Sequence, residues 1–155
     1  MTARSDNPGV WLPPPLWYGL AVLVGVLLER RWPLPVPASP VTSIAGIFFV
    51  AGWMALALVS IGRFRRSATS IVPIRPAGAL VLSGPYRYTR NPMYLSLALL
   101  TIGCGLLLVT LWPIILLVPT LLIVQRFVIL REERYLRRRF GSEYEAYARR
   151  VRRWL

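Results

Sequence analysis

One polar segment of this chain carries residue types that could bind an amino-acid-like ligand. It runs from Ser83 to Tyr94 (SGPYRYTRNPMY) and leads directly into an apolar stretch. A second apolar stretch follows and ends in the sequence REER, which contains Glu132 and Glu133. Arginine pairs with carboxylates through two parallel hydrogen bonds, and a carboxylate can accept an ammonium group. Because ionisable groups are costly at a membrane boundary, their convergence there indicates a functional site.

The composition predicts an integral membrane protein. The chain has 155 residues, which suits a single domain over 1–155, and 55% of them are hydrophobic. Apolar runs of about 17–25 residues are typical of membrane helices, because the backbone in lipid must satisfy its own hydrogen bonds. We therefore predict an all-α, polytopic membrane helix bundle with a cytoplasmic C-terminal helical cap. The four predicted transmembrane helices are 10–28, 41–61, 93–109 and 113–130, and the tail is 131–155.

The arginine distribution predicts the orientation of the bundle. The net charge is +13, and every basic residue is an arginine. Arginines gather in the loop 62–89 and in the tail 131–155, whereas the loop around Thr110 has none. The positive-inside rule therefore places the site and the C-terminus in the cytoplasm, as expected for an inner-membrane protein. Arg30 and Arg31 would lie on the opposite side, as a minor exception.

Proline, glycine and apolar residues fill the loop 62–89. This content predicts a structured, non-helical loop that packs on the membrane domain.

The side-chain chemistry of this sequence excludes several classes of function. It has no histidine and a single cysteine, Cys104, so histidine-based nucleophilic catalysis and most zinc sites are excluded, and we predict no metal. The arginines border apolar spans, which is where membrane proteins contact anionic lipid. Membrane lipids are therefore the expected partners, and nucleic acid is not. Nothing in the sequence indicates an oligomeric state.

The two apolar stretches predict how the site is assembled. Asn91 and Pro92 are a favoured start for a helix, whose positive end attracts anions. A very short loop joins the stretches, so they should form an antiparallel hairpin that returns Glu132 and Glu133 to the level of Arg90. A zwitterionic amino acid would fit there, with its carboxylate on Arg90 and its ammonium on either glutamate. Three simpler interpretations remain open: lipid anchoring by the arginines, an aromatic belt, and a solvated glutamate face.

The tail is predicted to be helical on both sides of Gly141. The helix of the last span should continue past residue 130 and end at Gly141. A capping-box pattern then begins at Ser142 and starts a second helix. Tyr144, Tyr147, Val151 and either Trp154 or Leu155 would lie on one face of it, with arginines around the rest. Such a basic amphipathic helix suits a membrane surface or the covering of a site.

These motifs resemble those of the isoprenylcysteine carboxyl methyltransferase and phospholipid methyltransferase superfamily. The resemblance covers roughly residues 63–155. It rests on the segment 84–94, on the Glu132–Glu133 pair after the last span, and on the sequence FGSEY that ends at Tyr144. The superfamily usually has a histidine where this chain has Asn91.

The resemblance implies S-adenosylmethionine as the cofactor, bound at the cytoplasmic end of the hairpin. It implies catalytic roles for Arg90 and Glu133, with Glu133 helping to remove a proton where the acceptor has one. The implied cofactor-binding residues are Val81, Leu82, Gly84, Tyr86, Arg90, Asn91, Tyr94, Glu132 and Glu133. The expected function is methyl transfer to a lipophilic or small acceptor, such as an isoprenylcysteine-like carboxylate, a phospholipid amine or a thiol.

Two alternative functions stay open. Membrane reductases that use NADPH resemble this hairpin, and their extra phosphate would need additional arginine contacts. A non-catalytic membrane adaptor would bind anionic lipid through its basic tail.

Overall fold

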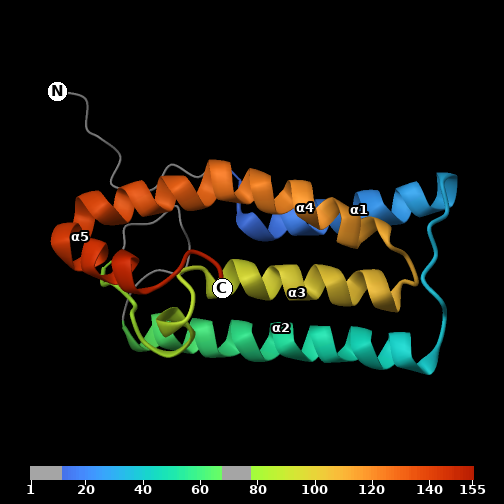
Figure 1. Ribbon diagram of the computed structural model, residues 1–155, viewed down its shortest axis with the longest axis horizontal. Coiled ribbons are helices and arrows are strands. Elements are labelled where there is room, and N and C mark those ends of the chain that lie inside the picture. The colour runs from blue at the N-terminus through green and yellow to red at the C-terminus, as the bar shows by residue number, and fades with distance from the viewer. Residues whose placement is uncertain (1–11, 68–77) are drawn as a thin grey trace.

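The computed structural model describes residues 12–67 and 78–155, which fold into a bundle of helices (Figure 1). Within those two ranges there is no β-strand, and an isolated bridge pairs Pro35 with Thr110. The predicted all-α fold is therefore confirmed. The helices are α1 (Pro14–Arg31), α2 (Pro40–Arg66), α3 (Pro92–Leu107), α4 (Trp112–Val124) and α5 (Leu130–Arg150), with a short 3-10 helix η1 (Gly84–Arg87) and a π-helical turn η2 (Gln125–Ile129).

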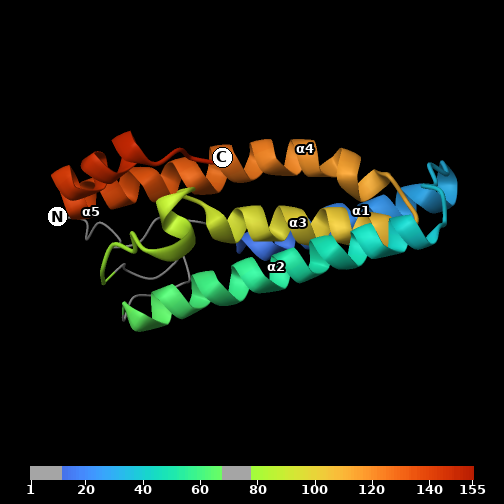
Figure 2. The ribbon, with the colours of Figure 1, turned by 60° about the horizontal axis from the view of Figure 1, so that its bottom comes forward.

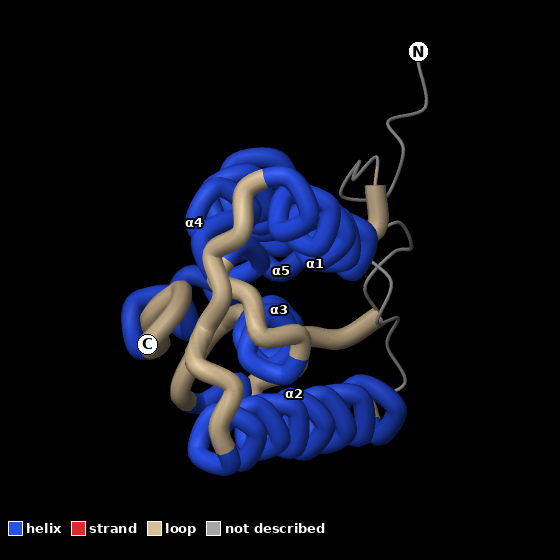
Figure 3. The backbone as a smooth tube through the Cα atoms, turned by 90° about the vertical axis from the view of Figure 1, so that its right-hand side faces the viewer, coloured by secondary structure: helices blue, strands red, loops and turns tan. Residues whose placement is uncertain are grey.

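Helix α3 lies at the centre of the bundle. Seen from one end, it stands between α2 on one side and the pair α1 and α4 on the other (Figure 3). Helix α4, η2 and the part of α5 before Gly141 form one long rod that runs back beside α3 and extends beyond its N-terminal end (Figures 1 and 2). At Gly141 α5 kinks, and its second part turns back toward the start of α3 (Figure 1). The predicted antiparallel hairpin is thus present, and its second arm continues past residue 130 as predicted.

The helices begin where the local sequence favours a start. Ser39 caps α2, because its hydroxyl accepts a hydrogen bond from the Thr42 amide at 3.1 Å. Proline stands at the first or second position of the four long helices α1 to α4, where its missing N–H is not needed. Helix α3 starts at Pro92 after Asn91, as predicted.

Glycines allow the helices to approach closely. A Cβ atom on Gly103 of α3 would lie 2.8 Å from the Val50 side chain of α2. A Cβ atom on Gly25 of α1 would lie 2.8 Å from Pro113 of α4. Both distances are shorter than real carbon contacts, so these glycines bring α2 and α1 against the central hairpin.

Two helical stretches are long and apolar enough to cross a membrane, namely α2 and the stretch from Trp112 to Arg150 that contains the rod. Helix α3 is a shorter apolar helix, and a span count of four stays a prediction. Large apolar side chains are exposed along α2, where lipid rather than water would suit them. These include Val41, Ile44, Ile47, Phe48 and Leu58.

Some predicted boundaries are wrong. Residues 62–66 are predicted to belong to a loop, yet α2 continues to Arg66 because no proline or glycine follows Gly62 before Ser67. Helix α1 runs from Pro14 to Arg31, so it ends three residues later than the span predicted at 10–28. The fourth predicted span contains Arg126, whose side chain is exposed on η2. Residues 68–77 of the predicted loop lie outside the described residues, as does the start of the first span. The described residues 78–89 are non-helical as predicted except for the short 3-10 helix η1.

Candidate functional site at the end of the hairpin

A tight turn positions the polar segment that precedes α3. Gly84 opens η1 with a positive φ of 65°, and a Cβ atom there would lie 2.8 Å from Nε of Arg63. Both conditions favour glycine. Tyr86 follows and is 7% exposed, with its ring edge-on to Phe64 at a centroid distance of 5.5 Å. The turn is therefore anchored to the end of α2, which leaves the residues after it to face α5.

The hairpin brings the predicted carboxylates to the start of α3. The Tyr94 hydroxyl donates a hydrogen bond to Oε1 of Glu132 at 2.7 Å. Nη1 of Arg90 lies 3.1 Å from Oε1 of Glu133. The prediction that the two glutamates return to the level of Arg90 and Tyr94 is confirmed. We call the cluster of these four side chains the mouth of the hairpin.

Glu133 already has two cationic partners. Besides Arg90, it accepts two hydrogen bonds from Arg153, one from Nε and one from Nη2, both at 2.9 Å. Glu133 is 6% exposed, so the bidentate pair is largely shielded from solvent on its acidic side. Arg90 also lies 3.5 Å from the Tyr144 hydroxyl. The residues predicted to be catalytic therefore come together, but they bind each other and Arg153.

The segment 151–155, which follows α5, lies in the mouth. The Arg153 carbonyl accepts hydrogen bonds from the Thr89 hydroxyl at 3.1 Å and from Nδ2 of Asn91 at 2.9 Å. The Arg90 amide donates to the Arg152 carbonyl at 3.0 Å. Nε1 of Trp154 donates to Oε1 of Gln125 at 2.8 Å, at the start of the π-helical turn. This segment thus bridges the start of α3 and the rod.

Sequence reasoning misses most of this arrangement. The amphipathic pattern of the tail predicts a helix through Val151 to the end of the chain, but α5 ends at Arg150 and the Val151 backbone is extended. The predicted inward face is nonetheless present, since Tyr144 is 2% exposed and Tyr147 is 5% exposed. Gly141 interrupts the helical geometry with φ 49°, as predicted. Trp154, predicted for that face with Leu155 as the alternative, packs against the core from the segment after α5 and not from a helix.

Asn91 takes the N-cap position without capping the helix by its side chain. Its amide group binds the Arg153 carbonyl instead, and its own N–H donates to the Thr89 hydroxyl at 3.2 Å. At the position where the resembling superfamily usually has histidine, this chain therefore uses a hydrogen-bond donor to hold the segment 151–155.

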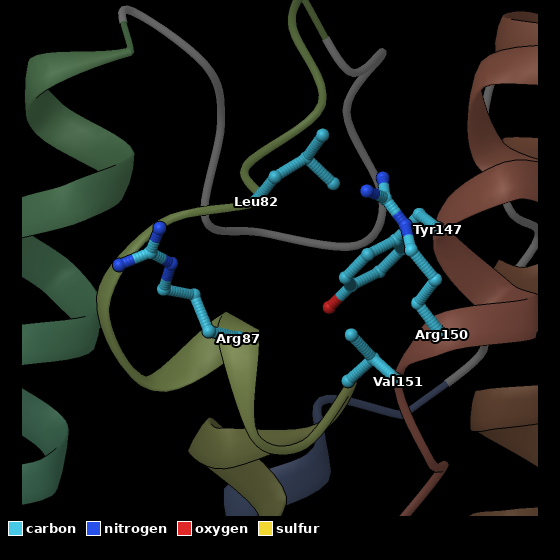
Figure 4. A pocket seen from close by; sticks show the side chains of 5 residues that line it. All are labelled: Leu82, Arg87, Tyr147, Arg150 and Val151. Atoms are coloured by element: carbon cyan, nitrogen blue, oxygen red, sulfur yellow. The ribbon is translucent and has the colours of Figure 1, made fainter.

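An open pocket of about 320 Å³ lies next to the segment 151–155, whose Val151 forms part of its wall (Figure 4). Arg87 and Arg150 stand on opposite sides of it, with an apolar and aromatic surface between them (Figure 4). The Tyr147 ring is held in place, because its hydroxyl donates to the Tyr86 carbonyl at 2.8 Å. The lining residues are Leu82, Arg87, Tyr147, Arg150 and Val151.

Only part of the predicted cofactor set reaches this pocket. Leu82 lies on its wall. Val81 is 6% exposed and buried beside it, and Gly84 and Tyr86 shape the turn beneath. The remaining predicted residues belong to the mouth: Arg90, Asn91, Tyr94, Glu132 and Glu133.

The electrostatics of the mouth separate the two glutamates. Burial raises the pKa of Glu132 to about 7, a smaller contribution from the charge of Glu133 acts in the same direction, and the Tyr94 hydrogen bond opposes both. Burial also raises the pKa of Tyr147, which therefore stays a protonated donor at neutral pH. The hydrogen bonds to Glu133 raise the pKa of Arg153, which keeps that pair ionic.

One donor in the mouth has no acceptor. Nε of Arg90 is buried and has no hydrogen-bond partner among the described residues. A buried unsatisfied donor on a charged group is costly, and native structures usually supply a ligand, water or ion to it. An anionic oxygen beside Arg90 would satisfy this donor.

Comparisons with known proteins identify the family of this chain. An uncharacterized protein of Haemophilus influenzae is 41% identical over 63 residues, which are 41% of this chain and 100% of that relative. No solved structure matches the chain. A family model described as phospholipid methyltransferase matches residues 41–143, which include α2, the turn, α3 and both glutamates. On this match the chain belongs to the phospholipid methyltransferase family, within the superfamily that its motifs resemble.

Proposed function

We propose that this protein is an integral membrane methyltransferase that uses S-adenosylmethionine and methylates a lipophilic or small acceptor. Family membership indicates methyltransferase activity in general. The observation that carries the cofactor assignment is the unsatisfied Nε of Arg90, in a mouth that also holds two carboxylates.

The residues present fit the two ends of that cofactor. Nε of Arg90, at the positive end of α3, suits its carboxylate. The pocket between Leu82 and the Tyr147 ring suits its adenosine, since an apolar and aromatic surface lies open there. Glu132 and Glu133 are the carboxylates that could pair with its ammonium, Glu133 in exchange for one of its arginines.

The chain's own residues would bind the acceptor and remove its proton where it has one. When bound, the cofactor would supply an activated methyl group, whose carbon would bond to the acceptor as its bond to the sulfonium sulfur breaks and S-adenosylhomocysteine leaves. A carboxylate acceptor needs no base, whereas an amine or thiol releases one proton. Glu133 is the proton acceptor that the resemblance implies, but both of its oxygens are engaged by arginines. We therefore assign that role to Glu132, whose raised pKa of about 7 suits a general base near neutral pH.

The site would lie at the cytoplasmic surface of a four-span bundle. The arginines of the turn and of α5 lie at the same end as the mouth, and the positive-inside rule places that end in the cytoplasm (Figure 1). In this position a lipophilic acceptor would reach Glu132 and Tyr94 from the bilayer. The acceptor classes that suit this access are an isoprenylcysteine-like carboxylate, a phospholipid amine and a lipophilic thiol.

Calorimetric titration of S-adenosylhomocysteine into the detergent-purified protein tests the cofactor assignment. We expect micromolar binding that Arg90→Ala weakens about 10- to 100-fold and that Arg30→Ala, at the opposite end of the bundle, leaves unchanged. NADPH serves as the competing ligand, and binding of NADPH alone would replace this proposal with the reductase. Transfer of labelled methyl groups into lipid, prenylthiol and thiol pools then identifies the acceptor.

A further inference from the structure

The segment 151–155 has the chemistry of a ligand. Its Arg153 presents a guanidinium to a buried carboxylate at 2.9 Å, and its Trp154 packs against the apolar core that contains Tyr94. A zwitterionic amino acid with a bulky substituent on its sulfur likewise presents a cation, its ammonium group, beside a bulky group. The segment therefore occupies Glu133 in the way the cofactor's ammonium would.

We propose that the segment 151–155 is an internal ligand that must leave the mouth before the methionine end of the cofactor can bind. This inference rests on the proposed function and adds a closed state to the same site. In the closed state Arg153 neutralises Glu133, and the donors of Thr89 and Asn91 are taken by the Arg153 carbonyl. In the open state those donors and Glu133 become available together.

The contacts of the segment are suited to exchange. The side chain of Arg153 is 32% exposed, so water can reach the pair from the arginine side. Besides the packing of Trp154, polar contacts join the segment to Thr89, Asn91 and Glu133, and a charged ligand offers the same kinds of polar contact to these residues. Nε of Arg90 is left without a partner among the described residues in this state, so the internal ligand satisfies the mouth only partly. A ligand that also brings a carboxylate can satisfy it completely.

The test measures ligand affinity and segment position in the same protein. Arg153→Gln removes the contacts to Glu133, and Arg149→Gln removes the same charge from an exposed position of α5 as the matched control. Arg153→Lys keeps the charge and serves as the second variant if Arg153→Gln folds poorly. The position is read by pulsed electron paramagnetic resonance between spin labels at Leu155→Cys and Val59→Cys in a Cys104→Ser background.

We expect Arg153→Gln to bind S-adenosylhomocysteine about tenfold more tightly, as for a site whose open state is populated in about one molecule in ten. Arg153→Lys should bind with intermediate affinity, and Arg149→Gln like the parent. Adding S-adenosylhomocysteine to the labelled parent should shift the distance distribution to that of labelled Arg153→Gln.

Two results would overturn the inference. If S-adenosylhomocysteine binds while the label distance stays fixed, or binds more weakly to Arg153→Gln and Arg153→Lys, the segment is a fixed wall of the site, and the methyltransferase proposal stands. If S-adenosylhomocysteine binds neither the parent nor these folded variants, the cofactor assignment and the internal ligand both fail.

Discussion

The two ends of the bundle both place charged and polar groups between helices, yet they are built differently. At the end remote from the mouth, Glu29 accepts from the Thr110 hydroxyl at 2.7 Å and from the Leu34 amide at 3.0 Å. Nε1 of Trp112 donates to the Trp32 carbonyl at 2.7 Å. The Glu29 carboxylate therefore links the connection between α1 and α2 to the connection between α3 and α4, and both of its hydrogen-bond donors are neutral. Such an arrangement stabilises the fold, and Glu29, Thr110 and Trp112 leave no buried side-chain polar atom unpaired for a ligand.

The mouth, by contrast, has more ionisable groups than its own contacts require. Two carboxylates, two arginines and Tyr94 meet there, and Nε of Arg90 has no partner within the described residues. Buried charge in excess of structural need is typical of binding and catalytic sites. The comparison teaches that hydrogen-bond completeness, rather than polarity alone, distinguishes the functional end from the structural end.

The largest effect is expected for the free energy of unfolding on removal of Glu133. Glu133→Gln leaves Arg90 and Arg153 facing each other without a counter-charge, which costs about 3 kcal/mol for a buried pair. Denaturant or thermal unfolding in detergent measures this. A loss no greater than that of Glu29→Gln would show that the two ends do not differ in this respect.

The second effect concerns ligand affinity. Arg90→Ala should weaken S-adenosylhomocysteine binding about 10- to 100-fold, because a hydrogen bond between charged groups contributes about 1.5–3 kcal/mol. Calorimetry measures the change, and Glu29→Gln is the control at the other end. Equal weakening by both variants would mean that stability, not contact with the ligand, sets the affinity.

A smaller effect is expected from pH through Glu132. Folding raises the pKa of this acid from 4.5 to about 7, so between these values the folded state binds more protons than the unfolded state. Its contribution to stability is therefore present below about pH 4.5 and is lost as pH rises through about 7, with a total on the order of 1–2 kcal/mol for a partly exposed group. Unfolding of the parent and of Glu132→Gln across this range measures it. An unchanged pH dependence in Glu132→Gln would assign it to another group.

Local signals in the sequence are sufficient for the hairpin and its polar end. The length of the two apolar stretches determines which residues face each other, so Arg90 and Tyr94 can be placed opposite Glu132 and Glu133 from residue spacing alone. Asn91 and Pro92 mark the helix start for the same reason: capping depends on a few neighbouring residues. Helix length and helix capping both follow from the regular geometry of a helix, so the sequence can specify them without contacts between distant residues.

The segment 151–155 cannot be placed in this way. Its position depends on hydrogen bonds between residues far apart in the chain, such as Thr89 and Arg153, which are 64 positions apart. An arginine-rich stretch after an amphipathic helix fits equally well on a lipid surface or in a cavity lined by carboxylates. The choice depends on whether Glu133 has spare acceptor capacity, and that depends on how Arg90 is oriented in three dimensions. Residue spacing identifies Glu133 and Arg90 as partners, yet it does not reveal that Arg153 also engages Glu133.

The smallest effect is expected at the opposite end of the bundle and completes the comparison. Thr110→Val removes the hydroxyl that donates to Glu29 while keeping the side-chain shape, and should lower the free energy of unfolding by about 1 kcal/mol. Because the amide of Leu34 still reaches Glu29, the carboxylate is not left without a partner. S-adenosylhomocysteine affinity, measured calorimetrically on the same sample, should remain that of the parent. A loss of affinity here would mean that the connection between α3 and α4 transmits strain along the hairpin to Arg90, and that the two ends act as one unit.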